Sequence, residues 1–277
     1  MLKQRILTAL ALLAVVLPAL FYPSPAPFIA VALVMIGAGT WEWGRLNGSS
    51  AGASIAIAAA CVTLCGLSWV NGLLARDLSG IWIAAGGGWV LGSAWLLTTG
   101  VAGWQRVPKA VRLAGGVIVL WVAWLAIAQA RALGINFLLS VLVLVWAADI
   151  FAYFSGRAWG RRKLAPSISP GKSWEGVWGG MVGVLVLALA WAAADALWKP
   201  DVVSLYTQLQ NRGMAFLVLG AVFLAAMSVV GDLVESLFKR SAGVKDSSGL
   251  LPGHGGVLDR VDALLPTLPL AMMLVSL

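Results

Sequence analysis

Apolar runs long enough to cross a lipid bilayer recur along the whole sequence, and they limit the possible folds more than any other feature. A transmembrane helix needs about 20 mostly apolar residues to cross a hydrocarbon core of about 30 Å, and such stretches return from one end of the chain to the other. Only 11% of the residues are charged, whereas soluble domains average about a quarter. The sequence therefore predicts an all-α, polytopic integral membrane protein without a large soluble domain.

Hydropathy and the turn-forming residues between the runs predict about nine transmembrane helices. The connectors carry proline and glycine breakers such as YPSPAP and NGSSAG. The predicted spans are 5–21, 27–44, 52–74, 80–99, 112–130, 135–156, 175–197, 213–238 and 262–277. We divide the chain into an N-terminal set of about five spans, 1–134, and a C-terminal catalytic part, 135–277, with polar loops 156–175 and 239–261. The first run mimics a secretory signal but lacks a clear cleavage site, so we expect it to remain a span.

The distribution of basic residues predicts the orientation of these spans. With the N-terminus inside, fifteen of the nineteen Lys and Arg residues fall on the cytoplasmic side and four on the other. Cytoplasmic loops carry such an excess of Lys and Arg, so we expect a cytoplasmic N-terminus and cytoplasmic loops 156–175 and 239–261. The net charge of +8 then reflects topology and anionic headgroups, and it does not predict nucleic-acid binding.

Acidic residues inside the predicted spans are the first candidates for a functional site. Asp232, Glu235 and Lys239 share one face of a helix because residues three and four apart are neighbours. Glu235 and Lys239 can form a simple ion pair, whereas Asp232 calls for a metal or a partner from another helix. Asp149 lies about 10 Å of helix from the end of its span, with Tyr153 on approximately the same face. Ionisable groups at such depth are expensive and usually mark a site.

The loop SPGKSWEG contains a GKS triplet but no nucleotide-binding P-loop. That motif needs a glycine five residues before Gly171, where this chain has Pro166, and it needs a preceding strand. Backbone N–H groups at the start of the following helix, together with Lys172 and Ser173, could hold phosphate oxygens. Positive-inside topology alone explains the other cations of this loop.

The segment KDSSGLLPGHGGVLDRVD, residues 245–262, contains the only histidine of the chain, His254. Asp259 and Asp262 stand three residues apart at an expected helix start, and with Asp232 they would repel one another without a cation. Mg²⁺ prefers a few carboxylates together with water and phosphate oxygens. Surrounding cations suit a polyphosphate: Lys239, Arg240, Lys245 and Arg260. This composition is typical of a phosphoryl- or nucleotidyl-transfer site.

Two stretches resemble the phosphatidate cytidylyltransferase (CDP-diacylglycerol synthase) family. They are SLFKRSAGVKDSSGLLPGHGGVLDRVD, residues 236–262, and AADIFAYFSGRAWGRRKLAPSISPGKSWEG, residues 147–176. The one departure is Trp159, where Phe is commoner in the family. The resemblance covers about the last 130 residues, and it implies transfer of CMP from CTP to phosphatidic acid with release of pyrophosphate.

The resemblance also implies roles for individual residues. Asp232 and Asp259 are expected to ligate Mg²⁺, with Asp149 or Asp262 contributing and a second cation close by. Lys172 and His254 are expected in the catalytic site, with His254 as a hydrogen-bond donor rather than a base. The expected substrate-binding residues are Lys239, Arg240, Lys245, Ser173, Asp246, Arg260 and Tyr153. The expected location is a bacterial inner membrane with the site facing the cytoplasm. The sequence leaves the oligomeric state open, a homodimer included.

Three other interpretations compete with this one. An ion-coupled transporter could use Asp149 and Asp232 as a relay, but the glycine-rich loop and the lack of two-fold hydropathy symmetry speak against it. A CDP-alcohol phosphotransferase would need a DG-containing array of four aspartates, which this sequence lacks. A docking surface for partner proteins would leave the intramembrane acids unexplained.

Overall fold

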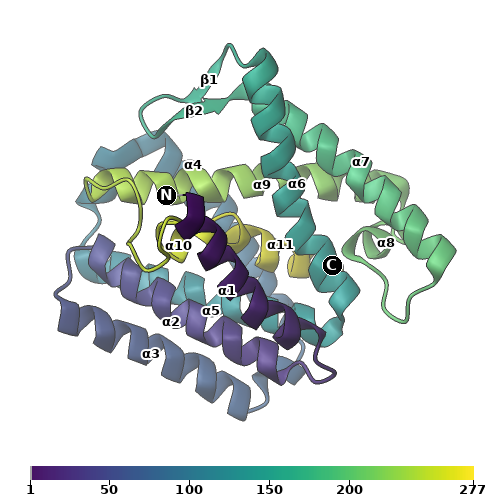
Figure 1. Cartoon of the computed structure of the whole chain (residues 1–277), viewed down its shortest axis with the longest axis horizontal. Helices are drawn as coiled ribbons and strands as arrows, with labels where there is room; N and C mark the ends of the chain where they lie inside the picture. Colours follow the sequence, from purple (N-terminus) through teal and green to yellow (C-terminus); the bar gives the residue numbers. More distant parts are fainter. Residues whose placement is uncertain (1) are drawn as a thin grey trace.

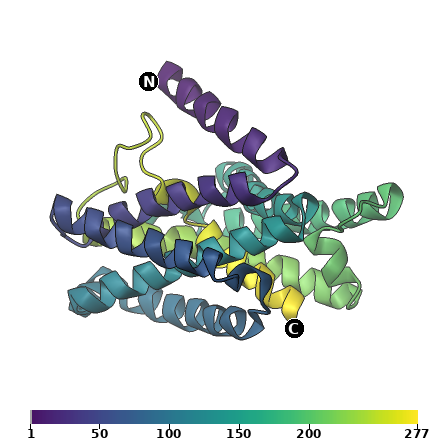
Figure 2. The ribbon, with the colours of Figure 1, turned by 90° about the horizontal axis from the view of Figure 1, so that it is seen from below.

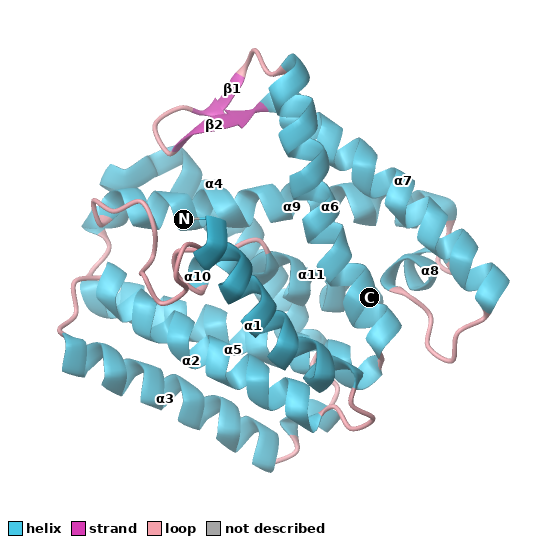
Figure 3. Ribbon diagram, viewed as in Figure 1, coloured by secondary structure: helices cyan, strands magenta, loops and turns pink. Residues whose placement is uncertain are grey.

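The computed structural model describes residues 2–277, with side chains from Gln4 onward, and its elements are mostly helices (Figure 1, Figure 3). Eight long helices make up most of the chain: α1 (Leu2–Phe21), α2 (Ala26–Leu46), α3 (Ala51–Val70), α4 (Ser79–Arg106), α5 (Lys109–Leu133), α6 (Ile135–Trp159), α7 (Trp174–Trp198) and α9 (Met214–Ser241). The short elements are η1 (Leu73–Ala75), β1 (Lys163–Ala165), β2 (Ser169–Ser173), α8 (Leu205–Gln210), α10 (Leu258–Val261) and α11 (Leu264–Ser276).

The eight long helices are long and apolar enough to cross a membrane, which confirms the polytopic helical class. The predicted ninth span, 262–277, is wrong. Its helix α11 has 13 residues and is therefore about 20 Å long, less than a hydrocarbon core of about 30 Å. The reason is that α11 begins inside the protein, where most of its residues are buried against other helices.

The loop after α6 contains a small β-hairpin, which the sequence pattern did not predict within this otherwise helical fold. Strands β1 and β2 pair antiparallel, with Lys163 opposite Ser173 and Ala165 opposite Ser169. Proline cannot supply the backbone N–H that a helix needs and disfavours helical backbone just before it. Pro166, in the turn at 166–168, and Pro170, in β2, therefore keep this segment from forming a helix until Ser173 caps α7, where its hydroxyl accepts a hydrogen bond from the Gly176 N–H.

The segments that contain or adjoin most of the basic residues lie at one end of the molecule, which we call the basic end: the start of α1 and residues 47–50, 107–108, 160–173 and 242–257. Arg5 donates to the carbonyl of Gly253 over 2.9 Å, and Lys109 donates to the carbonyl of Gly48 over 2.7 Å. Figure 2 shows α1 leaning away from the other helices, with its N-terminal end toward the loop after α9. Lys3 belongs to the same predicted charge group, but its side chain lies outside the described part of the chain.

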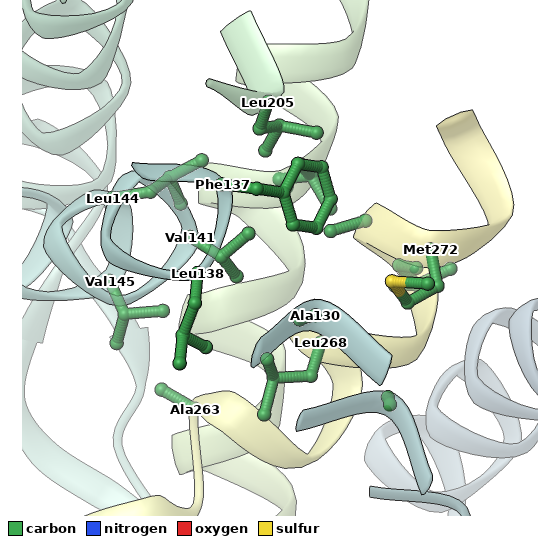
Figure 4. Close-up of a cluster of buried hydrophobic side chains, with 14 of the residues drawn as sticks. Ala130, Phe137, Leu138, Val141, Leu144, Val145, Leu205, Ala263, Leu268 and Met272 are labelled. Atoms are coloured by element: carbon green, nitrogen blue, oxygen red, sulfur yellow. The ribbon is translucent and has the colours of Figure 1, made fainter. Parts of the chain in front are cut away.

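The buried core extends through most of the long helices, and Figure 4 shows the part where α6 meets α8 and α11. Phe137, Leu138 and Leu144 of α6 are fully buried there. Helices α2, α4 and α5 pack against α9, α10 or α11, so both predicted parts of the chain share contacts; the division at residue 134 stays a prediction. Cys61 and Cys65 are free and buried, so they serve as small core residues.

Candidate functional site

The acidic face of α9 is arranged as the sequence predicts. The Lys239 ammonium lies 2.5 Å from a Glu235 carboxylate oxygen, which confirms the predicted ion pair. One turn earlier, the Ser236 hydroxyl donates to Asp232 over 3.2 Å. Both contacts follow from the spacing of four residues, which stacks side chains on one face of a helix.

Asp232 finds its cation outside its own helix. Strand β2 places the Lys172 ammonium 2.6 Å from Asp232 Oδ2. The two side chains are 23% and 33% exposed, so this ion pair is accessible to a ligand, unlike the nearly buried Glu235–Lys239 pair. The hairpin therefore positions a lysine of the basic end against the acidic face of α9.

Two further carboxyl groups surround this ion pair and interact electrostatically with Asp232: Asp149 of α6 and Asp262 of the turn between α10 and α11. We call Asp149, Lys172, Asp232 and Asp262 the Asp232 cluster. Within residues 2–277, no three acidic, histidine or cysteine side chains come close enough to hold one metal ion as they stand. The predicted set of four metal-binding aspartates is thus partly assembled, with Asp259 held by other contacts.

Asp262 shows that this cluster suits a cation. Burial, and after it the charge of Asp232, raise the pKa of Asp262 to about 7. In the described structure, the only hydrogen bond of the Asp262 carboxyl group comes from the Ala263 N–H, over 2.8 Å, and no described cation lies within 4.0 Å of that group. The charges of Asp232 and Asp262 oppose each other's ionisation, and only Asp232 is paired with a lysine, so a divalent ion fits this pair of carboxyl groups. Asp232 and Asp262, with Asp149 nearby, could therefore hold Mg²⁺.

The cluster is inset from the basic end. The turn between α10 and α11 approaches α9 so closely at Gly231 that an added Cβ would lie 2.6 Å from the Asp262 carbonyl oxygen. Helix α9 continues for ten more residues, to Ser241, which corresponds to about 15 Å. The chain therefore turns back into the protein after α9 and places Asp262 well below the end of that helix.

A second polar network holds Asp259, which lies in the first turn of α10 as predicted. Its oxygens accept hydrogen bonds from Lys239 over 2.6 Å, from the Ser247 N–H over 2.9 Å and from the Gly256 N–H over 2.8 Å. Burial opposes ionisation, but these hydrogen bonds hold the pKa of Asp259 below its usual value. Asp259 is therefore a charged acceptor that fixes Lys239 and the preceding loop.

Sequence reasoning missed Glu42 of α2, which belongs to the same network. This fully buried carboxyl group accepts hydrogen bonds from the Ser248 hydroxyl over 2.5 Å and from the Val257 and Leu258 N–H groups, each over 2.8 Å. An acidic residue inside a transmembrane helix was the available signal. The predicted N-terminal part thus supplies the anchor of the loop that carries Asp259.

The turn around His254 is built by glycines. Gly253 and Gly255 have φ angles of +78° and +85°, which side-chain-bearing residues rarely adopt. The His254 carbonyl accepts two hydrogen bonds from Arg260, over 2.7 and 3.0 Å, while its Nδ1 is buried without a partner in the described structure. Arg260 thus holds the turn, and Lys245 and Asp246 lie exposed beside it.

The other predicted substrate-binding residues lie in different settings. Ser173 is buried and caps α7. Tyr153 is 59% exposed, and its hydroxyl accepts a hydrogen bond from Arg157. Arg240 donates to the Ile168 carbonyl over 3.3 Å and so links α9 to the hairpin.

Eight apolar helices with a carboxyl-and-lysine cluster inset at a basic end define a polytopic membrane protein whose site suits phosphate and a cation. Residues 3–277 match the Cytidylyltransferase family. The phosphatidate cytidylyltransferase of Pseudomonas aeruginosa is 40% identical over 278 residues, covering 97% of this chain and 95% of that protein. The chain therefore belongs to the Cytidylyltransferase family.

Two further relatives match about half of the chain. The phosphatidate cytidylyltransferase of Haemophilus influenzae is 53% identical over 136 residues, which cover 49% of this chain and 44% of that protein. The protein of the same name from Bacillus subtilis is 40% identical over 144 residues, or 52% of this chain and 49% of that protein.

Proposed function

We propose that this chain is a phosphatidate cytidylyltransferase, which joins CTP to phosphatidic acid and yields CDP-diacylglycerol and pyrophosphate. We place it in a bacterial cytoplasmic membrane, with the basic end facing the cytoplasm. The observation that carries the proposal is the accessible Lys172–Asp232 ion pair, 2.6 Å long, beside Asp262 and inset below the basic end. Membership in the family favours this enzyme over an ion-coupled transporter built on Asp149 and Asp232.

The position of the cluster suits two substrates of opposite solubility. CTP arrives from water with several negative charges, which the cations of the basic end attract. The phosphate of phosphatidic acid lies at the bilayer surface while its chains stay in hydrocarbon. A cluster inset from the basic end but open to a ligand lets the two phosphates meet.

The reaction itself needs positioning more than proton transfer. An oxygen of the lipid phosphate attacks the α-phosphorus of CTP, a new P–O bond forms, and the bond to the β-phosphate breaks as pyrophosphate leaves. The attacking oxygen is already ionised, so a general base contributes little, and alignment with charge stabilisation carries the catalysis. We assign Lys172, Lys239, Arg240 and Lys245 to phosphate oxygens, and His254 to a hydrogen bond with phosphate.

The carboxyl groups fit a Mg²⁺ requirement. Asp232 and Asp262, with Asp149 nearby, would hold the ion, which when bound neutralises charge on the substrate phosphates. Asp259 as a metal ligand stays a prediction, because its oxygens already accept hydrogen bonds from Lys239, Ser247 and Gly256. In the structure as it stands, Asp259 positions Lys239, and we give it that role.

A direct assay tests the proposal. Purified protein with CTP, phosphatidic acid and Mg²⁺ is expected to release pyrophosphate and CDP-lipid in equal amounts, and a chelator of divalent ions is expected to stop both. Failure to form CDP-lipid under these conditions would refute the assignment.

Lys172→Ala tests the role of the cluster, with Lys163→Ala as its matched control. Both lysines lie on the hairpin, but Lys163 is exposed and only Lys172 pairs with Asp232. Loss of a charge-assisted phosphate contact removes about 1.5–3 kcal/mol, so we expect kcat/KM to fall about tenfold or more for Lys172→Ala alone. Equal kinetics for the two variants would return the hairpin to a purely topological role.

A further inference from the structure

A large apolar cavity lies between α4, α5 and α9, on the face of α9 turned toward α4. Its volume is about 620 Å³, within the usual range of roughly 300–1,000 Å³ for small-molecule sites. We call it the α4–α5 groove, and its lining is mostly apolar, including Ile81, Trp89, Val119, Val234 and Leu265.

The groove faces the lipid side of the helices. Helices α4 and α5 are consecutive but hardly touch, since α4 packs on α9 and α11 while α5 packs on α2 and α11. Val111 and Ile118 of α5 line the groove and are 57% and 56% exposed, which in a bilayer means contact with lipid. Gly88 and Gly92 of α4 leave open space within 4 Å of their missing side chains, so they widen the groove.

One end of the groove is charged, and it is the end near the basic connectors. Arg112 lies in the first turns of α5 and lines the groove, with its guanidinium 5.7 Å from the ring centre of Trp104. Its Nε is buried and has no hydrogen-bond partner in the described structure. A buried donor without a partner is unfavourable, so this end suits an anionic acceptor such as a phosphate oxygen.

The groove also adjoins the polar networks of the site. Glu235 lines it, and Lys239 bridges Glu235 to Asp259 with contacts of 2.5 and 2.6 Å. A ligand in the groove would therefore lie against one face of α9, and the Asp232 cluster would lie on the neighbouring face of the same helix.

We propose that the α4–α5 groove holds an acyl chain of phosphatidic acid, with the lipid phosphate at the Arg112 end. The proposal deepens the proposed function and rests on it. The groove has one charged end, at Arg112, and an apolar remainder that opens to the bilayer. Phosphatidic acid has the same arrangement, with a charged phosphate above apolar acyl chains. The groove does not suit CTP, because a triphosphate needs several cations and Arg112 is the only Lys or Arg that lines it within residues 2–277.

A pair of adjacent substitutions on α4 tests the position of the chain. Gly88 lines the groove and Gly87 does not, although both are exposed helical glycines with open space around them. We expect Gly88→Leu to raise the KM for long-chain phosphatidic acid about tenfold or more, by analogy with the discrimination that a hydrophobic pocket achieves for small changes in fit. We expect Gly87→Leu to leave it near the wild-type value. Dihexanoyl phosphatidic acid, which has chains of only six carbons, is expected to be used equally by both variants.

The charged end is tested with Arg112→Gln against Arg45→Gln, an exposed arginine at the end of α2. We expect only Arg112→Gln to raise the KM for phosphatidic acid, with the KM for CTP unchanged. In the wild-type protein, phosphatidic acid with a diazirine at the end of one acyl chain is expected to label peptides within 81–96 and 111–122 upon illumination.

The outcomes separate the two proposals. Absence of any CDP-lipid formation by the wild-type protein refutes the proposed function. Turnover by the wild-type protein overturns the groove assignment if Gly88→Leu and Gly87→Leu affect long-chain lipid alike, if Gly88→Leu affects both lipids alike, or if the label falls outside those peptides.

Discussion

At the scale of single residues, the acidic groups inside this protein fall into two kinds. Glu42 and Asp259 accept several hydrogen bonds each, so their charges are compensated and they hold structure in place. Asp262 accepts one described hydrogen bond and faces the charge of Asp232. An enclosed carboxyl group without compensation is unfavourable in a folded protein, and binding of a cation would remove that cost. The difference in partners thus separates the anchors of the loop from the groups that suit an ion.

Glu42→Gln tests the anchor. An amide would place its NH₂ group against donors that now meet a carboxyl oxygen, leaving at least one buried group unpaired, at a cost of about 1–3 kcal/mol. We expect the loop 245–258 to loosen and kcat to fall about 10- to 100-fold, by analogy with residues that orient the ligands of a metal site through hydrogen bonds. Limited trypsin cleavage at the exposed Lys245 is expected to become faster.

Ser248→Ala is the matched control, because it removes one of the donors to Glu42 and leaves both backbone donors. We expect a much smaller loss of turnover and little change in cleavage. If Glu42→Gln matched the wild-type protein in both measurements, the anchoring role would be wrong.

At the scale of elements, the site is made by one close helix contact and one hairpin. Gly231 lets α11 start against the middle of α9, and this contact sets the depth of Asp262. The hairpin β1–β2 supplies Lys172 to the same level. Hydropathy alone could not predict the contact at Gly231 or the hairpin, because neither of them is a long apolar helix.

Gly231→Ala tests the close contact. A Cβ at this position would lie 2.6 Å from the Asp262 carbonyl and 2.8 Å from Pro266 Cγ, so backbone must move. Overpacking of this kind costs about 1–3 kcal/mol, and we expect a lower Tm in detergent together with a severe loss of turnover. Gly220→Ala on the same helix would meet the flexible end of the Leu209 side chain at 3.0 Å and is expected to cost less. Equal effects of the two substitutions would argue against a special role for the α9–α11 contact.

At the scale of the whole molecule, the sequence predicts the helical class and the acidic face of α9 because both depend on local periodicity. Eight of nine predicted spans are long helices in the structure, and the Glu235–Lys239 pair forms as its spacing requires. The predicted ninth span is a short interior helix in the structure. The prediction failed because hydropathy cannot distinguish a buried helix from one that crosses the membrane. The contacts of Lys172 with Asp232 and of Glu42 with residues 247–258 join positions far apart in the sequence, and no local pattern encodes them.

The orientation of the molecule is the last property that the charge pattern predicts, and labelling of single cysteines tests it. Hydrogen bonds between connectors place the start of α1, the hairpin and loop 242–257 at one end, and Arg131 ties the α1–α2 connector to the other end through the Tyr22 carbonyl. Gly249 at the basic end and Asp201 in the connector after α7 are both exposed. In a background with Cys61 and Cys65 replaced by alanine, we expect a membrane-impermeant maleimide to label Asp201→Cys in intact spheroplasts. Gly249→Cys is expected to react only after the membrane is permeabilised. The opposite pattern would put the basic end outside, away from cytoplasmic CTP, and would contradict the positive-inside argument and the proposed access of the nucleotide together.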